Sequence, residues 1–568
     1  MVLAVVLILT TWFAGAPAGL APVVPFVACL LLALARLLRA RPSIPQPASE
    51  TLLCLALAVL YRLPALLHPW GFVNKDGAYG AFVALHLVQG VRPAPVFTEG
   101  ANYQGTLKGH LAALLWQTTG ARDLSLLMVL ASLLLFLVFL VASMALARRV
   151  GGRGAALVTG LCLAVGPRFL TVFSLNCVGQ YVDVLALGGV ALAVLARMLD
   201  TGERGPAARG DYVVVGFLLG AAFWQQPVAL SYLVTVGLIL AVRRDTWTDP
   251  WTLLVGLGLL VGALPVLLWN VQNGWATGDI VGRDATEIRA QVEALLHLIR
   301  RTWRISFPIL AGLSPDHPWG DVPGLRPLVA ALPPLLLVGH LAVHGRAIAA
   351  GLRHFRPVAA LLPPLLMTVC LVIFWSIASG RVYWRPRYLL PVMAATVVHL
   401  GVLGAALARR SRVAAAAGLG LLLALNARGT VPRLLESKGL ADSYARLVRS
   451  LEDKGIRTGY SDFSISAPVT MFTSERIVLS PRLGPTPAYE SELHAQRVDQ
   501  DGPDAYVLLP EDDPELFAAL LRSLGVDYRR DLDPVPVFYG FSRRVRLEEV
   551  AGFRGPGNEP AGSPTGEE

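Results

Sequence analysis

Charged residues are scarce in this 568-residue sequence, and lysine is nearly absent, with four in the whole chain. Asp, Glu, Lys and Arg make up 15% of the residues, against about a quarter in soluble proteins, whereas 54% are hydrophobic. This balance excludes a cytosolic enzyme and a disordered or collagen-like chain. The five cysteines form no CxxC pair and no zinc-type cluster with histidine. A disulfide scaffold is therefore excluded, and we expect the cysteines to be small packing residues.

The motifs of nucleotide-binding proteins and of common hydrolases are missing as well. No GxGxxG, P-loop, GxSxG or HExxH segment occurs, so nothing supports nucleotide binding or serine or zinc hydrolysis. The formal net charge is +10, but the basic residues are mainly arginines that flank apolar runs. We therefore expect no nucleic-acid partner.

Long apolar runs are what the sequence has instead. Runs near the ~20 residues that a membrane-spanning helix needs recur through the first three quarters of the chain. They predict a polytopic α-helical membrane protein with about 12 transmembrane helices, within a range of about 11 to 13. The segment 1–16 is either a further span or a signal-like piece. The predicted spans are 19–37, 50–68, 123–146, 155–174, 181–199, 212–225, 227–242, 251–271, 326–345, 357–379, 388–408 and 413–428.

Arginine clusters fall on every second loop between these spans. By the positive-inside rule those loops are cytoplasmic, which places loops 69–122 and 272–325 and everything after residue 429 on the other side. We therefore expect a multi-pass protein of the inner (plasma) membrane with a periplasmic or extracellular C-terminal domain. The stretch 284–304 carries apolar residues on one side and arginines on the other, which predicts a helix at the lipid interface.

Composition divides the chain into three parts. Residues 1–429 hold 33 basic and 16 acidic residues, and residues 430–568 hold 16 basic and 23 acidic. We expect 1–429 to be the membrane domain and 430–554 to be a small soluble α/β domain, because short strand and helix patterns alternate there. Residues 555–568 are rich in Gly, Pro and Glu, which predicts a disordered end.

Carboxylates are the first place to look for chemistry, because an acid near hydrocarbon is costly and usually functional. Five occur before residue 200. Glu50 and Asp123 open predicted spans, which explains both as helix N-terminal charges. Asp76, Glu99 and Asp183 remain on the predicted outer face. The alternative for Asp76 is the N-cap of the following helix, and the alternative for Asp183 is capping or an interface position.

Several segments, in order, resemble the GT-C superfamily of membrane glycosyltransferases. DGAYGAFVALHLVQGVRPAPVF resembles their first outer loop, in which an acidic motif precedes an amphipathic helix. NYQGTLKGHLAALLWQTTG, GQYVDVLALGG, FWQQPVALSYL and RPRYLLPVMAA are similar to motifs of the bacterial family 39 group, which includes protein O-mannosyltransferases and lipid A aminoarabinose transferases. GYSDFSISAPVTMFTSERIVLSP resembles a pattern of the soluble part of this group. The resemblance covers most of residues 60–480, but Lys108 stands where the family has a glutamate, and His110 where it has a tyrosine.

The resemblance implies a GT-C-like fold and an enzyme that transfers a sugar from a polyprenyl-phosphate donor to an acceptor hydroxyl, with inversion. The acceptor is a glycan, a lipid or a protein, and membrane lipids surround the site. Asp76 is the expected general base, because a carboxylate can take the hydroxyl proton. Whether a divalent metal ion takes part stays open. The expected donor-phosphate ligands are Lys75, Lys108, Arg381, Arg385 and Arg387, and the expected sugar or acceptor ligands are Tyr79, Tyr103, Asp183, Gln225 and Gln226.

Two other functions fit the same residues. A transporter or flippase of a lipid-linked sugar would favour polar groups at mid-span and matched broken helices in two halves. The sequence has a single such break, at Gln225-Gln226-Pro227. A catalytically silent cell-envelope scaffold is the second alternative, and the departure at Lys108 is the feature that favours it.

Overall fold

The computed structural model describes residues 48–91, 95–99, 101–202, 209–277, 288–313, 325–378, 385–483, 491–550 and 553. The predicted span 19–37, the segment 1–16, Arg381 and the predicted disordered end 555–568 lie outside these residues.

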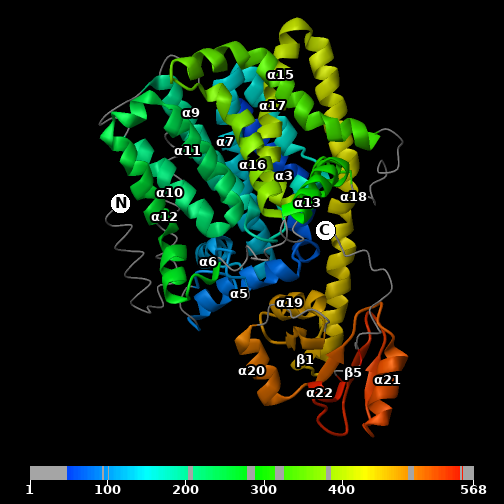
Figure 1. The fold of residues 1–568 in the computed structure, drawn as a ribbon. Coiled ribbons are helices and arrows are strands. Elements are labelled where there is room, and N and C mark those ends of the chain that lie inside the picture. Colours follow the sequence, from blue (N-terminus) through cyan, green and yellow to red (C-terminus); the bar gives the residue numbers. More distant parts are fainter. Residues whose placement is uncertain are drawn as a thin grey trace.

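A bundle of apolar helices forms the larger part of the molecule (Figure 1). Seven helices among the described residues are long and apolar enough to cross a membrane. The predicted total of about 12 spans stays a prediction, because the first 47 residues are not described and other apolar helices are shorter. The bundle helices are α3 (Ala48–Tyr61), α4 (Leu63–Leu67), α7 (Leu124–Ala164), α8 (Arg168–Phe173), α9 (Tyr181–Thr201), α10 (Arg209–Gln225), α11 (Leu230–Val242), α12 (Leu253–Gln272), α15 (Leu325–Arg353), α16 (Leu362–Ala378), α17 (Leu390–Arg410) and α18 (Arg412–Asp453).

Helix α7 consists of two antiparallel helices that turn at Gly152, where φ is 82°. A Cβ added at Gly160 would lie 2.7 Å from the Met144 sulfur, whereas in a straight helix residues 144 and 160 would be about 24 Å apart. The predicted spans 123–146 and 155–174 thus fall on separate helical segments, the second of which ends at Ala164 and is followed by the short α8. Glu50 pairs with Arg148 and Arg153 beside this turn, so the start of α3 lies at the same end of the bundle as the arginine-rich turn.

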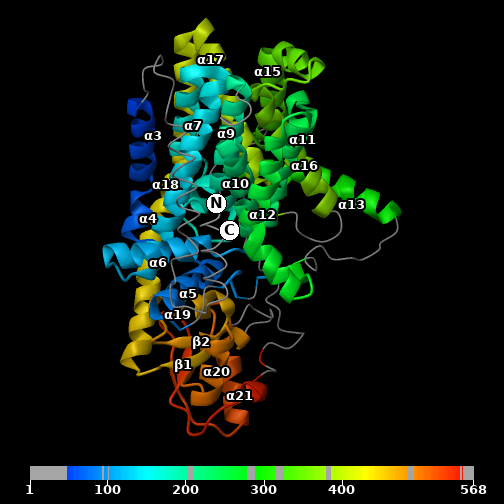
Figure 2. The same cartoon turned by 90° about the vertical axis from the view of Figure 1, so that its left-hand side faces the viewer.

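The opposite end of the bundle, here called the loop end, carries α5 (Lys75–Gln89), α6 (Leu107–Thr119) and the C-terminal sheet domain. Figures 1 and 2 show α5 and α6 lying across this end, between the bundle and the sheet domain. Helix α18 runs from the arginine end past the loop end without a break, and so passes through residue 430, where the predicted domain boundary lies. Two further helices, α13 (Ile288–Arg301) and α14 (Phe307–Leu310), follow α12, and α13 projects sideways from the bundle as the predicted interface helix would (Figure 2).

The C-terminal domain is a small α/β sheet, as predicted. The order is β2-β1-β3-β5-β4, in which β2, β1 and β3 are parallel and β5 pairs antiparallel with both β3 and β4. Apolar side chains of the central strands pack against the helices that connect them, and these strands are buried. The elements are β1 (Thr458–Ser461), α19 (Phe463–Phe472), β2 (Val478–Ser480), α20 (Glu492–Asp501), β3 (Ala505–Val507), α21 (Pro514–Ser523), β4 (Arg529–Asp531), β5 (Val537–Tyr539) and α22 (Leu547–Val550).

Two GxxxG pairs bring α10 and α12 into backbone contact. A Cβ added at Gly262 would lie 2.2 Å from the Phe217 carbonyl oxygen, and one at Gly220 would lie 2.2 Å from the Leu259 carbonyl oxygen. In a membrane, where apolar lipid competes with apolar side chains, such close backbone approach is a main source of helix association.

Replacing Gly262 by leucine should therefore destabilise the bundle, because the added side chain would clash with the backbone of α10. We expect a loss of about 1–3 kcal/mol or more, the usual cost of overpacking, measured as a lower unfolding temperature in detergent. Gly256→Leu is the matched control, because Gly256 lies on the same helix and faces open space. Equal effects of the two changes would contradict this account of the α10–α12 contact.

Candidate functional site

Asp76 lies in the first turn of α5 at the loop end. The N-cap of this helix is Asn74, whose side-chain oxygen accepts a hydrogen bond of 3.0 Å from the Gly77 amide. The alternative interpretation of Asp76 as the N-cap is therefore wrong. Its carboxylate is half-buried and lies in the first turn of α5, the end of the helix where an acidic side chain is favourable.

Arg387 connects Asp76 to two tyrosines, and a third tyrosine lies near those two. It lies in the short turn Pro386–Leu389 before α17, and its guanidinium interacts electrostatically with Asp76. The guanidinium carbon is 5.9 Å from the centre of the Tyr181 ring and 5.7 Å from that of Tyr388. The Tyr388 hydroxyl has two side-chain hydrogen-bond partners, the Arg387 guanidinium and the Tyr181 hydroxyl. Tyr103, from the stretch before α6, is close enough to interact electrostatically with both of these tyrosines.

These five residues, here called the Arg387 cluster, come from four separate segments. The structure thus brings together three predicted site residues, Asp76, Tyr103 and Arg387. Tyr181 and Tyr388 were not predicted, although each stands within a motif that carries the GT-C resemblance. The cluster places a carboxylate, a guanidinium and phenol hydroxyls at one end of an apolar bundle, which suits the binding of a polar, anionic group.

Lys108 and Asp183 form a buried ion pair beside this cluster. Lys108 is 1% exposed and Asp183 is fully buried. The ammonium nitrogen lies 3.5 Å from an Asp183 carboxylate oxygen and donates a hydrogen bond to the Gly179 carbonyl. The basic residue that departs from the family pattern is therefore balanced by an acid on α9, because a buried charge needs a partner of opposite sign.

Gln225, at the end of α10, holds the stretch that carries Tyr103. Its side-chain oxygen accepts a hydrogen bond of 3.1 Å from the Leu107 amide, and its main-chain oxygen accepts one of 3.0 Å from the Gly105 amide. Gly105 fits because a Cβ there would lie 2.6 Å from the Gln225 side chain. Gln226 is buried next to it, where α10 ends at the predicted break.

The remaining predicted residues lie apart from the cluster. The Lys75 ammonium lies 5.3 Å from the centre of the Phe463 ring, on α19 of the C-terminal domain. The ring of Tyr79 is buried 5.7 Å from the same phenylalanine. Arg385 is exposed. Asp123 caps α7 by accepting hydrogen bonds from two amides of its first turn, as its helix-opening position predicted.

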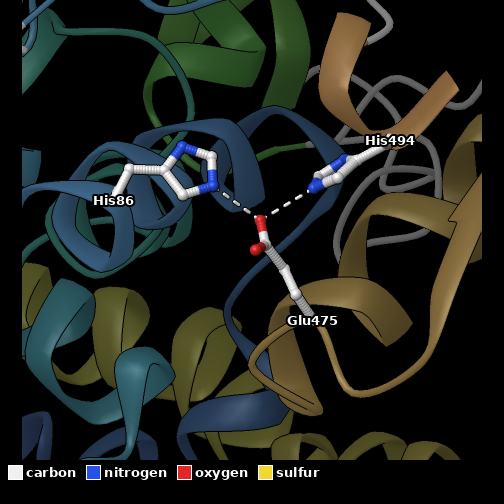
Figure 3. A group of neighbouring side chains, drawn as sticks. All are labelled: His86, Glu475 and His494. Atoms are coloured by element: carbon white, nitrogen blue, oxygen red, sulfur yellow. Dashed lines mark hydrogen bonds and ion pairs between the residues drawn. The ribbon is translucent and has the colours of Figure 1, made fainter. Parts of the chain in front are cut away.

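A second polar cluster joins α5 to the C-terminal domain (Figure 3). Nε2 of His86 and Nε2 of His494 each lie 2.8 Å from the same oxygen of Glu475. Burial raises the pKa of the Glu475 carboxyl. The hydrogen bonds from His494 and His86 have a larger, opposite effect, and the resulting pKa is lowered to about 2. The carboxylate is therefore ionised at neutral pH. Sequence reasoning missed this cluster because His86 and Glu475 are 389 residues apart.

Comparison with known proteins identifies the fold. No family model and no curated protein matches the sequence. Among solved structures, ArnT from Cupriavidus metallidurans in the apo state has a TM-score of 0.53 at 16% identity, over 88% of this chain and 98% of that chain. ArnT bound to undecaprenyl phosphate has the same TM-score and identity, over 87% and 98%. The oligosaccharyltransferase of Archaeoglobus fulgidus in complex with Zn and sulfate has a TM-score of 0.50 at 12% identity, over 87% and 72%. The chain therefore shares the fold of these structures, and this agrees with the GT-C-like fold expected from its sequence.

Removing one member of the Lys108–Asp183 pair should destabilise the protein, because the other charge is then buried without a partner. For Lys108→Met we expect a loss of about 3–5 kcal/mol, and for Asp183→Leu a loss of similar size. The double variant should recover much of either loss, since it removes both charges. Thermal unfolding of the four proteins in detergent measures this coupling, with exposed Lys75→Met as the control. Additive losses would show that the two charges are not coupled.

Proposed function

We propose that this chain transfers a sugar from a polyprenyl-phosphate donor to an acceptor hydroxyl at the outer face of the membrane, with inversion. The observation that carries the proposal is the interaction of Asp76 with Arg387 at the loop end of a GT-C fold. A base and a phosphate ligand are the two groups that this reaction needs, and Asp76 and Arg387, which are far apart in the sequence, are suited to these roles.

The proposed step uses the two groups on the two sides of the anomeric carbon. The acceptor oxygen forms a bond to this carbon while its proton passes to the Asp76 carboxylate. The bond between the anomeric carbon and the phosphate oxygen breaks, and its electron pair leaves with the polyprenyl phosphate. Arg387 stabilises the charge that develops there, since a fixed guanidinium can pair with a phosphate through two hydrogen bonds. Attack opposite the leaving group inverts the configuration.

Support for a polyprenyl-phosphate donor comes from the ArnT structure that holds undecaprenyl phosphate, in a protein of the same fold. We assign the phosphate to Arg387 rather than to Lys108, because the Lys108 ammonium is already paired with Asp183. Exposed Lys75 and Arg385 are suited to the headgroups of surrounding lipids or to the donor phosphate, and Arg381 stays a predicted phosphate ligand. Tyr79, Gln225 and Gln226 have packing or hydrogen-bonding roles that position the loop-end segments around the sugar.

The proposal includes the orientation and the partners expected from the sequence. The loop end and the C-terminal domain face the periplasm or the cell exterior, and the arginine end faces the cytoplasm. The acceptor is a glycan, a lipid or a protein that reaches the Arg387 cluster from that side. A flippase would move the lipid-linked sugar without breaking the glycosidic bond, and a silent scaffold would bind without turnover, so product formation separates the three functions.

Asp76→Asn should abolish transfer while leaving the fold and donor binding intact, because the amide keeps the shape but cannot take a proton. We expect kcat to fall by ~10²–10⁴. The measurement is sugar release from short-chain polyprenyl-phosphate sugars by the purified protein. Glu99→Gln is the matched control, since Glu99 is another outer-loop acid. Unchanged turnover in Asp76→Asn would exclude Asp76 as the base.

Arg387→Lys should weaken donor use, because an ammonium keeps the charge but cannot form the paired contact with phosphate. A lost charge-assisted hydrogen bond of about 1.5–3 kcal/mol corresponds to a roughly 10- to 100-fold fall in kcat/KM for the donor. Arg385→Lys, two residues away and exposed, is the control. An equal effect of both substitutions would point to a general electrostatic contribution instead of a specific phosphate site.

A further inference from the structure

The contact between α5 and the C-terminal domain contains three side chains of a kind that bind transition metals. His86 lies near the end of α5, Glu475 in the turn between α19 and β2, and His494 in the first turn of α20. All three side chains point to a common centre in Figure 3. The ligand atoms of these three side chains all lie within 4.8 Å of one another. Among the described residues, this is the group of three or more His, Cys, Asp or Glu side chains that lies this close together.

The distances leave room for an ion after a small adjustment. Each histidine Nε2 is 2.8 Å from one Glu475 oxygen. Ligand atoms around a tetrahedral zinc ion with bonds of about 2.1 Å are about 3.4 Å apart, so each contact needs to open by about 0.6 Å. Without an ion, both Nε2 atoms donate hydrogens to the carboxylate. An ion would take their place, with the imidazoles neutral and protonated on Nδ1.

The surroundings fix the orientation of all three ligands. Phe82 lies one turn before His86 on α5, and its ring is 4.7 Å from that of His494 and 6.5 Å from that of His86. The two histidines and Glu475 are largely shielded from solvent, with exposed fractions of 7%, 7% and 18%. The Phe82 ring packs against both imidazoles and helps to fix their orientation, as metal sites require of their ligands.

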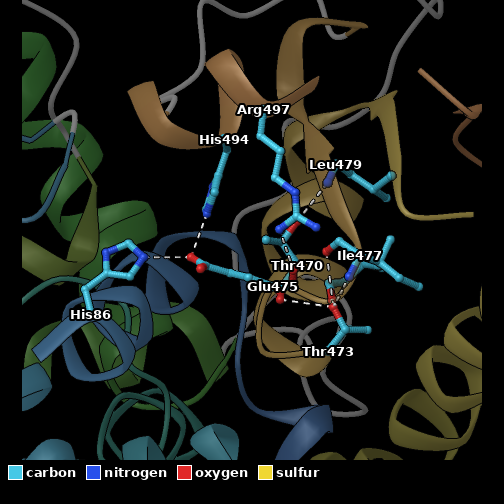
Figure 4. Close-up of polar contacts among 9 residues, drawn as sticks. His86, Thr470, Thr473, Glu475, Ile477, Leu479, His494 and Arg497 are labelled. Atoms are coloured by element: carbon cyan, nitrogen blue, oxygen red, sulfur yellow. Dashed lines mark hydrogen bonds and ion pairs between the residues drawn. The ribbon is translucent and has the colours of Figure 1, made fainter. Parts of the chain in front are cut away.

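The turn that presents Glu475 is unusual and firmly held (Figure 4). Ser474 and Glu475 have φ values of 48° and 63°, in the left-handed region that non-glycine residues adopt only at an energetic cost. Arg497 donates a hydrogen bond of 2.8 Å to the Glu475 carbonyl oxygen. On the other side, the Thr473 hydroxyl binds the main chain of Ile477, and the Thr470 hydroxyl accepts from the Leu479 amide. Such strain persists where the surrounding structure demands it, and here its result is to aim one carboxylate between two histidines.

We propose that His86, Glu475 and His494 bind a divalent transition-metal ion, most suitably Zn²⁺, with water at a fourth position. Two imidazoles and one carboxylate form a set that zinc prefers among the metals available to proteins. The ion would join α5 to the C-terminal domain. His86 lies ten residues after Asp76, about 15 Å along the helix, so the ion is a structural link and not a participant at the Arg387 cluster.

Metal binding by the full-length protein in detergent tests the proposal directly. The protein is stripped with a chelator and titrated with Zn²⁺ by calorimetry, and with Co²⁺ by absorption spectroscopy. We expect one ion per chain, visible Co²⁺ bands of four- or five-coordinate nitrogen and oxygen ligation, and a rise in unfolding temperature with Zn²⁺. Glu475→Gln and His494→Ala should each weaken binding by on the order of 100-fold, whereas exposed His354→Ala should not.

Several results would overturn the proposal. Zn²⁺ affinity that is unchanged in Glu475→Gln and His494→Ala would show that the ion binds elsewhere. Absence of the Co²⁺ bands in the unaltered protein, a measurement that needs no variant to fold, would show that the three side chains form a hydrogen-bonded contact only. Because these measurements use no donor or acceptor, their outcome is independent of the proposed glycosyl transfer.

Discussion

Polar groups buried among apolar helices must find partners within the protein, and the buried guanidinium of Arg62 meets this constraint at the start of the loop end. Arg62 follows α3 and is fully buried. It donates hydrogen bonds to the carbonyl oxygen of Ala164, the last residue of α7, and to the Ser174 hydroxyl, and its guanidinium lies 4.1 Å from the centre of the Phe136 ring. A cation at the C-terminus of a helix satisfies carbonyls that have no partner and suits the helix dipole. This contact fixes where the bundle ends and the first loop begins, so the position of Asp76 depends on it.

Other buried polar side chains at the loop end also have partners within the protein. Lys108 is balanced by Asp183, Gln225 pairs with the amides before α6, and Trp224 donates to the Val96 carbonyl oxygen. The Arg387 guanidinium lies 5.9 Å and 5.7 Å from the centres of two tyrosine rings and interacts with Asp76. Each pairing attaches a loop segment to the end of a bundle helix. The segments around the Arg387 cluster are held in place because their buried polar groups pair with one another. Preorganised polar groups of this kind are what electrostatic stabilisation of a reaction requires.

Local patterns in the sequence predicted much of this architecture. The apolar run 181–199 corresponds to α9, the Gln225-Gln226-Pro227 break separates α10 from α11, and Asp123 caps α7. The continuity of α18 was not predicted, because Pro432 and the change from apolar to polar composition suggest an end where the helix in fact continues. Contacts between residues far apart in the sequence could not be predicted either. No periodicity indicates that Lys108 meets Asp183, that Arg387 meets Asp76 or that His86 meets Glu475, since these contacts arise only when helices pack.

The contact between α5 and the C-terminal domain has a consequence for biosynthesis. His86 and Glu475 are separated by 389 residues, so at about 5–20 residues per second the ribosome needs about 20–80 s to make the second partner after the first. During this time the surface that covers Phe82 and Tyr79 does not yet exist. Every helix of the bundle is inserted before the loop end can be completed. A chain truncated before Glu475 would therefore lose the covering of α5, so the loop end is completed only when roughly the final sixth of the protein has been made.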